Sequence, residues 1–350
     1  MLQVCDAFDL LACPVDRSEL RAEGRGLRCE HGHSYPGIAV LLRADVQQTI
    51  GIAQASLDQA RAYQSGGRDD PLFIETLGIT DRERDELRKA VASAGTGVDP
   101  VVSYLIAATN GILYKNLAGR LNSIPIPTLR LPPADGQRLL DVGCNWGRWS
   151  LAAAGKGYRP IGIDPSLGAV LAAKRLAAGQ GLSFDGIVGD ARHLPLKNGA
   201  VDCAFSYSVL QHFSKPDARE ALRQIARVTR PDGTVKIQMA SATGIRSLYH
   251  LARRKFREPT HFDVRYWLPG ELVGEFRRIF GNAELNVDCF FGLGLQPSDL
   301  AIMPPPARTL VRVSEVLRRA STVARPLAYV ADSVYLTSRN AARAGTAGAA

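Results

Sequence analysis

Apolar runs of strand length alternate with amphipathic stretches over residues 137–240. The runs are rich in Val, Ile and Leu, and the stretches between them carry apolar residues at helical spacing. This pattern predicts strands at 138–142, 160–164, 184–188, 201–206 and 234–239, and helices at 147–156, 167–178 and 217–229. Because strands and helices alternate, we expect an α/β fold built on a parallel sheet.

The flanking segments are mainly helical in pattern. Thr80 and Glu83 form a capping-box pattern that opens a helix reaching about Ala94. Ser166 and Asp217 are expected to be N-caps of the helices that follow them. Further helices are predicted at 48–63, 101–121, 269–280 and 307–323, and the last two strands at 284–291 and 331–337.

A glycine-containing turn joins the first predicted strand to its helix. Leu139 to Gly147 read L-L-D-V-G-C-N-W-G, and the next strand ends in Asp164. A dinucleotide fingerprint needs a further glycine, but position 148 is Arg. Asp141, beside the turn, would repel a pyrophosphate and suits the ammonium group of S-adenosylmethionine. The turn therefore favours a nucleoside cofactor without phosphates.

This set of motifs resembles the class I S-adenosylmethionine-dependent methyltransferases over about residues 137–240. D-V-G-C-N-W-G is similar to their first motif, although Asn145 stands where glycine is commonest. Asn tolerates left-handed backbone angles, so we expect the turn to be preserved. The resemblance implies a Rossmann-like, seven-stranded sheet whose final strand is antiparallel.

The same resemblance implies which residues bind S-adenosylmethionine. The acid after the second strand would hold the ribose, and the segment 189–191 would read the adenine edge. The expected cofactor residues are Asp141, Gly143, Asn145, Gly147, Asp164, Asp190, Ala191 and Ser206. Ser206 and the following Tyr207 face the sulfonium region in the family.

A general base is needed only if the methyl acceptor carries a proton at the attacking atom. His212 follows the fourth strand, where family members often place a histidine. His261 and Asp263 lie in an aromatic segment where the family inserts substrate-recognition elements. We treat His212 and His261 as candidate catalytic residues. Packing or helix capping by His212, and a hydrophobic flap around His261, are the alternatives.

Residues 9–43 form a separate small module with two loops that carry potential metal ligands. Cys13 and Asp16 lie in the first loop, and Cys29 and His33 in the second. The segment resembles the zinc-binding domain known as a tRNA-methyltransferase partner, and its second loop resembles that of zinc-containing rRNA guanine methyltransferases. Asp16 replaces the cysteine of that family, so zinc bound by these four residues and a metal-free ribbon both remain open. His31 is an alternative ligand to His33.

Composition narrows the remaining possibilities. Six cysteines scattered through 350 residues are typical of a cytoplasmic protein and not of a disulfide framework. We expect neither a membrane span nor a secretory signal. The net charge is +9, and residues 241–350 carry 15 Lys and Arg against 9 Asp and Glu. The excess allows an RNA or another anionic ligand, or only a solvated basic surface.

We therefore predict a methyltransferase acting on a small molecule, a glycan or a lipid-linked acceptor. The aromatic segment 256–267 favours an apolar pocket, and no base-methylation motif of the N-P-P-Y type follows the fourth strand. An rRNA or tRNA methyltransferase and a non-catalytic partner-binding scaffold are the alternatives. The expected organisation is a ribbon at 1–44, a helical cap at 45–135, the cofactor domain at 136–339 with a substrate insertion at about 241–330, and a disordered tail at 340–350.

Overall fold

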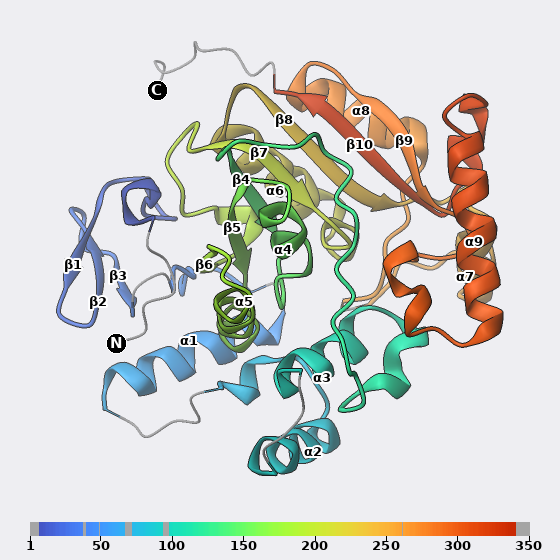
Figure 1. Ribbon diagram of the computed structural model, residues 1–350. Helices are drawn as coiled ribbons and strands as arrows, with labels where there is room; N and C mark the ends of the chain where they lie inside the picture. Colours follow the sequence, from blue (N-terminus) through green and yellow to red (C-terminus); the bar gives the residue numbers. More distant parts are fainter. Residues whose placement is uncertain are drawn as a thin grey trace. The chain divides into compact units, whose positions relative to one another are not determined.

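The central sheet of the computed structural model has seven strands in the order β6-β5-β4-β7-β8-β10-β9 (Figure 1). The strands are β4 (Arg138–Val142), β5 (Arg159–Asp164), β6 (Asp185–Val188), β7 (Val201–Ser206), β8 (Thr229–Ala240), β9 (Glu284–Cys289) and β10 (Ser333–Arg339). β5 and β6 are parallel, as are β7 and β8, whereas β10 runs antiparallel to both β8 and β9. The predicted α/β fold and its antiparallel final strand are confirmed.

The structure describes residues 7–37, 40–48, 50–66, 72–93, 98–260 and 262–340. His261 and residues 341–350 of the predicted tail lie outside them. The chain divides into two compact units. The first takes in residues up to 136, 140–197 and 298–304, and the second takes in 137–139, 198–297 and the residues from 305 onward.

Among the described residues, three α-helices of the first unit precede the central sheet in sequence: α1 (Gly51–Gln64), α2 (Asp81–Ala92) and α3 (Pro100–Thr109). The helices α4 (Arg148–Ala154) and α5 (Leu167–Gly179) follow β4 and β5. The amides at the start of α5 need partners outside the helix. Ser56 Oγ accepts the Leu167 N–H at 3.0 Å, and Thr76 Oγ1 accepts the Gly168 N–H at 2.7 Å. Residues before the sheet are thereby fixed immediately beyond the end of β5.

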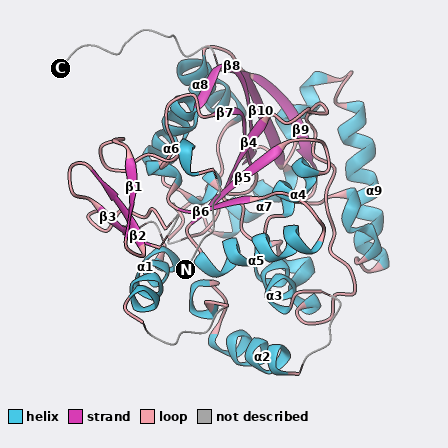
Figure 2. Cartoon of the chain, turned by 60° about the vertical axis from the view of Figure 1, so that its left-hand side comes forward, coloured by secondary structure: helices cyan, strands magenta, loops and turns pink. Residues whose placement is uncertain are grey.

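A small antiparallel sheet also belongs to the first unit. It consists of β1 (Leu20–Glu23), β2 (Gly26–Cys29) and β3 (Ser34–Pro36), in that order (Figure 2). Backbone hydrogen bonds connect the segments that flank this small sheet to β6 and to the loop after β6. The Leu41 N–H donates to the Val188 carbonyl at 2.8 Å, and the Ala12 N–H donates to the Pro195 carbonyl at 3.0 Å. The ribbon-like module is therefore hydrogen-bonded to the segment around β6.

The second unit carries the helices α6 (Lys215–Val228), α7 (Ile245–Arg253), α8 (Pro269–Phe280) and α9 (Pro305–Ala320). The bounds of α8 are those predicted from its apolar periodicity. Its Phe276 and Phe280 are fully buried, with ring centroids 5.2 Å apart. Arg277 and Arg278 are exposed, whereas Leu272, Phe276 and Phe280 are buried, so α8 turns one apolar face to the unit.

Side-chain caps begin α2, α3, α5 and α6. The Thr80–Glu83 capping box and the Ser166 N-cap are confirmed. The predicted N-cap at Asp217 is wrong: Ser214 caps α6 by accepting the Asp217 N–H, and Pro216 occupies the first turn. Proline has a backbone angle preset for that position, so the helix starts earlier than Asp217.

The single helix predicted at 101–121 is also wrong. α3 ends at Thr109, Gly111 has φ 104°, and a 3₁₀ helix, η3 (Ile112–Leu117), follows. A left-handed glycine cannot continue an α-helix, so apolar periodicity on both sides of Gly111 belongs to two elements. The predicted start of β8 at residue 234 is wrong as well, since the strand starts at Thr229. Its pairing with β7 shifts register between Val201 and Cys203, so residues 230–233 form a bulged part of the strand.

Candidate functional site

The turn after β4 adopts the left-handed backbone that its sequence predicts. Gly143, Asn145 and Gly147 have φ values of 76°, 47° and 85°. At Gly147 an added Cβ would lie 2.9 Å from Ala173 Cβ, which is closer than real Cβ atoms approach. Glycine is therefore required there both by the backbone angle and by the approach of α5. Asn145 keeps the turn despite its departure from the commonest residue.

Asp164 at the tip of β5 is hydrogen-bonded to this turn. Its Oδ2 accepts the Asn145 N–H at 3.0 Å, and its Oδ1 accepts the Ser166 N–H at 2.9 Å. Burial raises the pKa of the Asp164 carboxyl to about 6, and the two backbone donors oppose that rise. The carboxylate is thus fixed in position beside the glycine turn, with lone pairs remaining on each oxygen for further donors.

Asp141 is the second acid at this end of the sheet. It lies near the end of β4, is only 1% exposed, and accepts one side-chain hydrogen bond, from Ser150 Oγ at 2.7 Å. Burial raises its pKa to about 7, and the neighbouring charge of Asp164 adds to the rise. Two interacting carboxyls with few donors favour a cation or a donor-rich ligand beside them.

The remaining predicted cofactor residues lie at the ends of the neighbouring strands. Asp190 follows β6, caps a 3₁₀ turn that begins at Ala191, and pairs with Arg192 at 2.7 Å. The Asp190 carboxylate therefore already has a charged partner. Ala191 comes directly after Asp190 in the chain and begins the 3₁₀ turn. Ser206 is the fully buried last residue of β7, in the second unit. Tyr207, which follows it, donates its hydroxyl to Asp288 Oδ2 at 2.7 Å.

His212 is held in one tautomer within the second unit. Its Nδ1 lies 2.6 Å from the Phe262 carbonyl oxygen, and its ring stacks on Phe262 with centroids 4.3 Å apart. A carbonyl oxygen only accepts, so Nδ1 carries the proton and Nε2 the lone pair. Burial lowers the pKa of His212 below its ordinary value. Arg265 donates to the His212 carbonyl at 2.6 Å and fixes the backbone.

One cluster in the first unit was not predicted from the sequence. Arg148, the residue after Gly147, donates to Asp299 Oδ1 at 2.6 Å, and Tyr114 Oη also bonds Asp299. All three side chains are buried. Asp299 comes 151 residues after Arg148 in the chain, and no local pattern relates them. The cluster joins η3 and residues 298–304 to the start of α4, next to the glycine turn.

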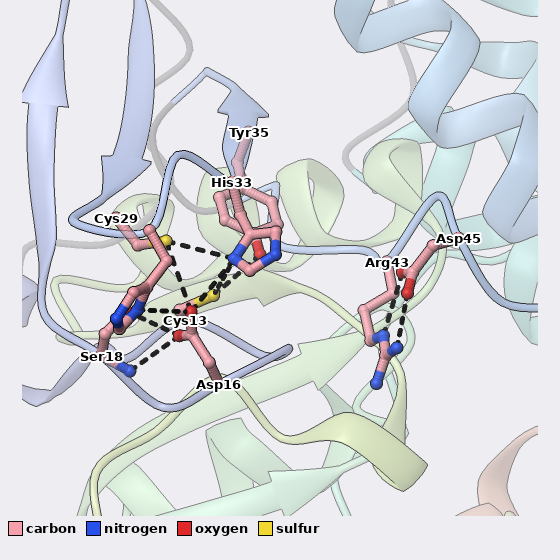
Figure 3. A network of polar contacts seen from close by, with 9 residues as sticks. Cys13, Asp16, Ser18, Cys29, His33, Tyr35, Arg43 and Asp45 are labelled. Atoms are coloured by element: carbon pink, nitrogen blue, oxygen red, sulfur yellow. Dashed lines mark hydrogen bonds and ion pairs between the residues drawn. The ribbon is translucent and has the colours of Figure 1, made fainter.

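The four candidate metal ligands of the ribbon-like module converge (Figure 3). His33 Nδ1 lies 3.6 Å from Cys13 Sγ, 3.2 Å from Cys29 Sγ and 3.1 Å from Asp16 Oδ2. All four donor atoms lie within 4.8 Å of one another. Zinc bonds of about 2.0–2.3 Å at tetrahedral angles place ligand atoms about 3.3–3.8 Å apart. The donor set and its spacing therefore fit a four-coordinate zinc ion.

Two further side chains contact this cluster from outside. His31 Nδ1 lies 2.9 Å from Asp16 Oδ2, and the His31 side chain is 63% exposed. Tyr35 Oη lies 3.1 Å from Cys13 Sγ and is buried. His31 therefore contacts the carboxylate and not the cysteine sulfurs, which leaves His33 as the histidine placed among the four donors. Tyr35 was not singled out in the sequence, because tyrosine is not a usual ligand.

The fold is Rossmann-like, and Asp141 and Asp164 lie beside its glycine turn. Residues 139–233 match a family model described as a methyltransferase domain. The matched segment contains the glycine turn, Asp164 and the segment through β7.

Similar proteins match parts of the chain. An uncharacterized 37.1 kDa protein in transposon Tn4556 of Streptomyces fradiae is 32% identical over 180 residues, covering 49% of this chain and 49% of the relative. A malonyl-[acyl-carrier protein] O-methyltransferase of Serratia marcescens is 32% identical over 113 residues, covering 32% of this chain and 42% of the relative. The chain thus spans about half or less of the length of these relatives.

Among solved structures, the YcgJ protein from Bacillus subtilis is 20% identical, with a TM-score of 0.38, over 60% of this chain and 94% of that one. Within the described residues, no helix is both long and apolar enough to cross a membrane.

Proposed function

We propose that this protein transfers the methyl group of S-adenosylmethionine to a small-molecule, glycan or lipid-linked acceptor. The observation that carries the proposal is the pair of acids beside the left-handed turn. Asp141 and Asp164 both have raised pKa values because they are buried with few donors. The cofactor has an ammonium group and a ribose diol, which supply the positive charge and the donors that these carboxylates lack.

The chain's own residues would act mainly by binding and orientation. The turn at Gly143, Asn145 and Gly147 would let the backbone approach the methionine part, and Asp164 would accept hydrogen bonds from the ribose hydroxyls. Asp190, Ala191 and Ser206 complete the proposed cofactor set. When bound, the cofactor supplies both the electrophilic methyl group and the leaving group. The protein aligns the acceptor with that methyl group and excludes water.

His212 is the proposed general base for an acceptor that must lose a proton. Its fixed tautomer presents a lone pair on Nε2, and burial lowers its pKa, so the ring is neutral near pH 7. A neutral imidazole can take a proton from a hydroxyl as the methyl group is transferred. His261 stays a second candidate for this role.

Calorimetric titration with S-adenosylmethionine tests the cofactor proposal. Wild type should bind, and Asp164→Ala should lose the hydrogen bonds to the ribose and bind at least about tenfold more weakly. The exposed Asp58→Ala variant in α1 controls for loss of a carboxylate elsewhere. A screen for cofactor consumption against metabolite and RNA pools then seeks the acceptor, with Asp164→Ala as the blank. Equal behaviour of wild type and Asp164→Ala in both experiments would refute the proposal.

We also propose that Cys13, Asp16, Cys29 and His33 bind one structural zinc ion. Support comes from donor spacing that matches tetrahedral geometry and from four different donors with no open position. Tyr35, beside Cys13 Sγ, would orient this sulfur from the second layer. The ion would fix the two loops of a module too small to have a large core of its own.

Metal analysis of the purified full-length chain tests the zinc site. Wild type should contain one zinc ion per chain, and Cys29→Ser and His33→Ala should lose it. His31→Ala and Cys144→Ser are matched controls that should keep it, because His31 contacts only the carboxylate and Cys144 lies in the glycine turn. A wild type that neither contains zinc nor takes it up after reduction would show that the module is metal-free.

A further inference from the structure

α7 in the second unit exposes its apolar side. Ile245, Leu248, Tyr249 and Ala252 are spaced as i, i+3, i+4 and i+7, which places them on one helix face. The first three are 63%, 47% and 60% exposed. An amphipathic helix of a globular protein normally turns such a face to the core. In α7 the face is turned outward.

Polar groups hold the opposite side of α7 against the unit. Ser247 is 1% exposed, and both its N–H and its hydroxyl donate to Asp332 Oδ1, at 2.7 and 3.0 Å. Arg246 Nη1 lies 3.4 Å from the Phe291 carbonyl oxygen. These hydrogen bonds fix the rotation of the helix about its axis. The exposed apolar face is therefore set by buried polar contacts on the other side.

The segment after α7 continues the exposed surface with strained backbone. Lys255 and Phe256 both have φ 56°, although neither is glycine. Phe256 is 69% exposed, so its ring gains little packing from the conformation. Left-handed backbone angles are unfavourable for residues other than glycine. Strain that leaves an aromatic ring in solvent points to a contact made outside this chain.

The charge of this segment is of one sign. Residues 245–257 contain five Lys and Arg and no Asp or Glu. The Arg254 guanidinium donates a hydrogen bond to the Val264 carbonyl. The side chains of Arg253, Lys255 and Arg257 are exposed. Tyr329 is 53% exposed, and its carbonyl accepts a hydrogen bond from Thr243 just before α7. Apolar and basic side chains are thus exposed together.

We infer that this surface binds to an anionic lipid bilayer. We call it the α7 surface and define it as Ile245, Leu248, Tyr249, Arg253, Lys255, Phe256 and Arg257. A helix that lies in the membrane interface needs an apolar face of bulky residues and basic residues that reach phosphate headgroups. An acidic protein partner would use the basic side chains but would not need the row of aliphatic and aromatic groups. The combination favours the bilayer.

This inference goes beyond the proposed methyl transfer and does not depend on it. Vesicle binding requires neither cofactor nor acceptor, so it can be measured on the protein alone. If both hold, the α7 surface would bring the enzyme to an acceptor dissolved in, or linked to, the lipid phase. Cofactor calorimetry on the same variants separates the two: α7-surface variants should bind S-adenosylmethionine like wild type.

Co-sedimentation of the full chain with vesicles tests the inference. Wild type should bind vesicles of phosphatidylcholine mixed with phosphatidylglycerol and not those of phosphatidylcholine alone. Leu248→Ser with Phe256→Ser should lower the partition coefficient at least about tenfold, since each change removes a bulky apolar group. Arg253→Glu with Lys255→Glu should lower it by at least as much. Val91→Ser and Arg82→Glu, on exposed positions of α2, are the matched controls.

Three results would overturn the inference. The first is no binding of wild type to anionic vesicles. The second is binding that the charge variants abolish and the apolar variants leave unchanged, which is adsorption by charge alone. The third is a concentration-dependent dimer in sedimentation velocity that Leu248→Ser with Phe256→Ser dissociates, because a second copy would then cover the α7 surface. Circular dichroism and thermal unfolding of each variant verify that it is folded.

Discussion

Neutralising Asp141 should change how the stability of the free protein depends on pH. This carboxyl is 1% exposed and has a single hydroxyl donor, Ser150. Burial and the charge of Asp164 raise its pKa from 3.8 to about 7. Asp141→Asn keeps the shape and removes the charge. The difference between this variant and wild type therefore measures how ionisation of this one group changes the free energy of unfolding.

The sign follows from proton binding in the two states. Between pH 4 and 7 the folded Asp141 keeps its proton while the unfolded one has lost it, so the unfolded state binds fewer protons. Stability therefore falls as pH rises through this window, by about 1.4 kcal/mol per pH unit, and levels off above pH 7. The whole effect is about 4 kcal/mol, calculated from the rise in pKa from 3.8 to about 7. The Asp141→Asn variant should lack this pH-dependent loss of stability.

The assay is thermal and urea unfolding of cofactor-free protein from pH 5 to pH 8. Relative to wild type, Asp141→Asn should gain stability as pH rises to 7 and show a constant difference above it. Asp58→Asn, on the exposed face of α1, should run parallel to wild type throughout. A difference between Asp141→Asn and wild type that stays the same at every pH would refute the argument, since the buried group would then not titrate in this range.

Cofactor binding gives an independent readout of the same group. An ammonium group beside Asp141 favours the carboxylate, so binding below pH 7 should release a proton. Affinity should then fall about tenfold per pH unit as pH drops from 7 to 6, and more steeply below 6, where Asp164 also becomes protonated. Calorimetry in buffers of different ionisation enthalpy counts the protons. Binding without proton release at pH 6 would contradict the assigned role of Asp141.

Three further changes follow from the site. His212→Gln should lower kcat about 10²–10⁴-fold on an identified hydroxyl acceptor without changing the cofactor Kd in calorimetry, and an unchanged kcat would exclude the base role. Asp299→Asn should destabilise the fold by about 3–5 kcal/mol in urea unfolding by leaving buried Arg148 unpaired, whereas Arg148→Met with Asp299→Leu should cost less. Gly147→Ala should lower the free energy of unfolding by about 1–2 kcal/mol and weaken cofactor binding, because this position has φ 85° and lies close to Ala173. A variant with wild-type Kd and stability would contradict the turn argument.

The part of the site that sequence could predict is the part built from neighbouring residues. Gly143 to Gly147 and Asp164 are spaced by one strand, one turn and one helix, so a parallel sheet has to bring them to the same edge. The left-handed angle of Asn145 also followed from its own side chain. The capping box at Thr80 is local in the same way. Each of these predictions depended on chemistry within a few residues or on one regular crossover.

The errors arose where two local preferences competed. Asp217 is a good N-cap residue, but Pro216 and Ser214 together satisfy the first turn of α6 better. Apolar residues on both sides of Gly111 have helical spacing, yet the positive φ of this glycine separates them into α3 and η3. Periodicity reports which face is apolar. It does not report where the backbone leaves the helix.

Contacts between distant segments were beyond sequence reasoning, and the α7 surface shows why. No helix is predicted from the sequence at residues 245–253, where Ile245, Leu248 and Tyr249 lie on one face of α7. Such a face is usually buried. What reverses it is Asp332, far along the chain, which accepts two hydrogen bonds from Ser247 and so fixes the polar side inward. Turning α7 over would take both Ser247 donors from Asp332 Oδ1, while the Phe291 N–H would still donate to Oδ2. A buried carboxylate oxygen without donors is costly, and three exposed apolar side chains are costly too unless a complex covers them. A bilayer surface supplies that complex, and this makes vesicle binding a test of the fold's own energetics as well as of its partner.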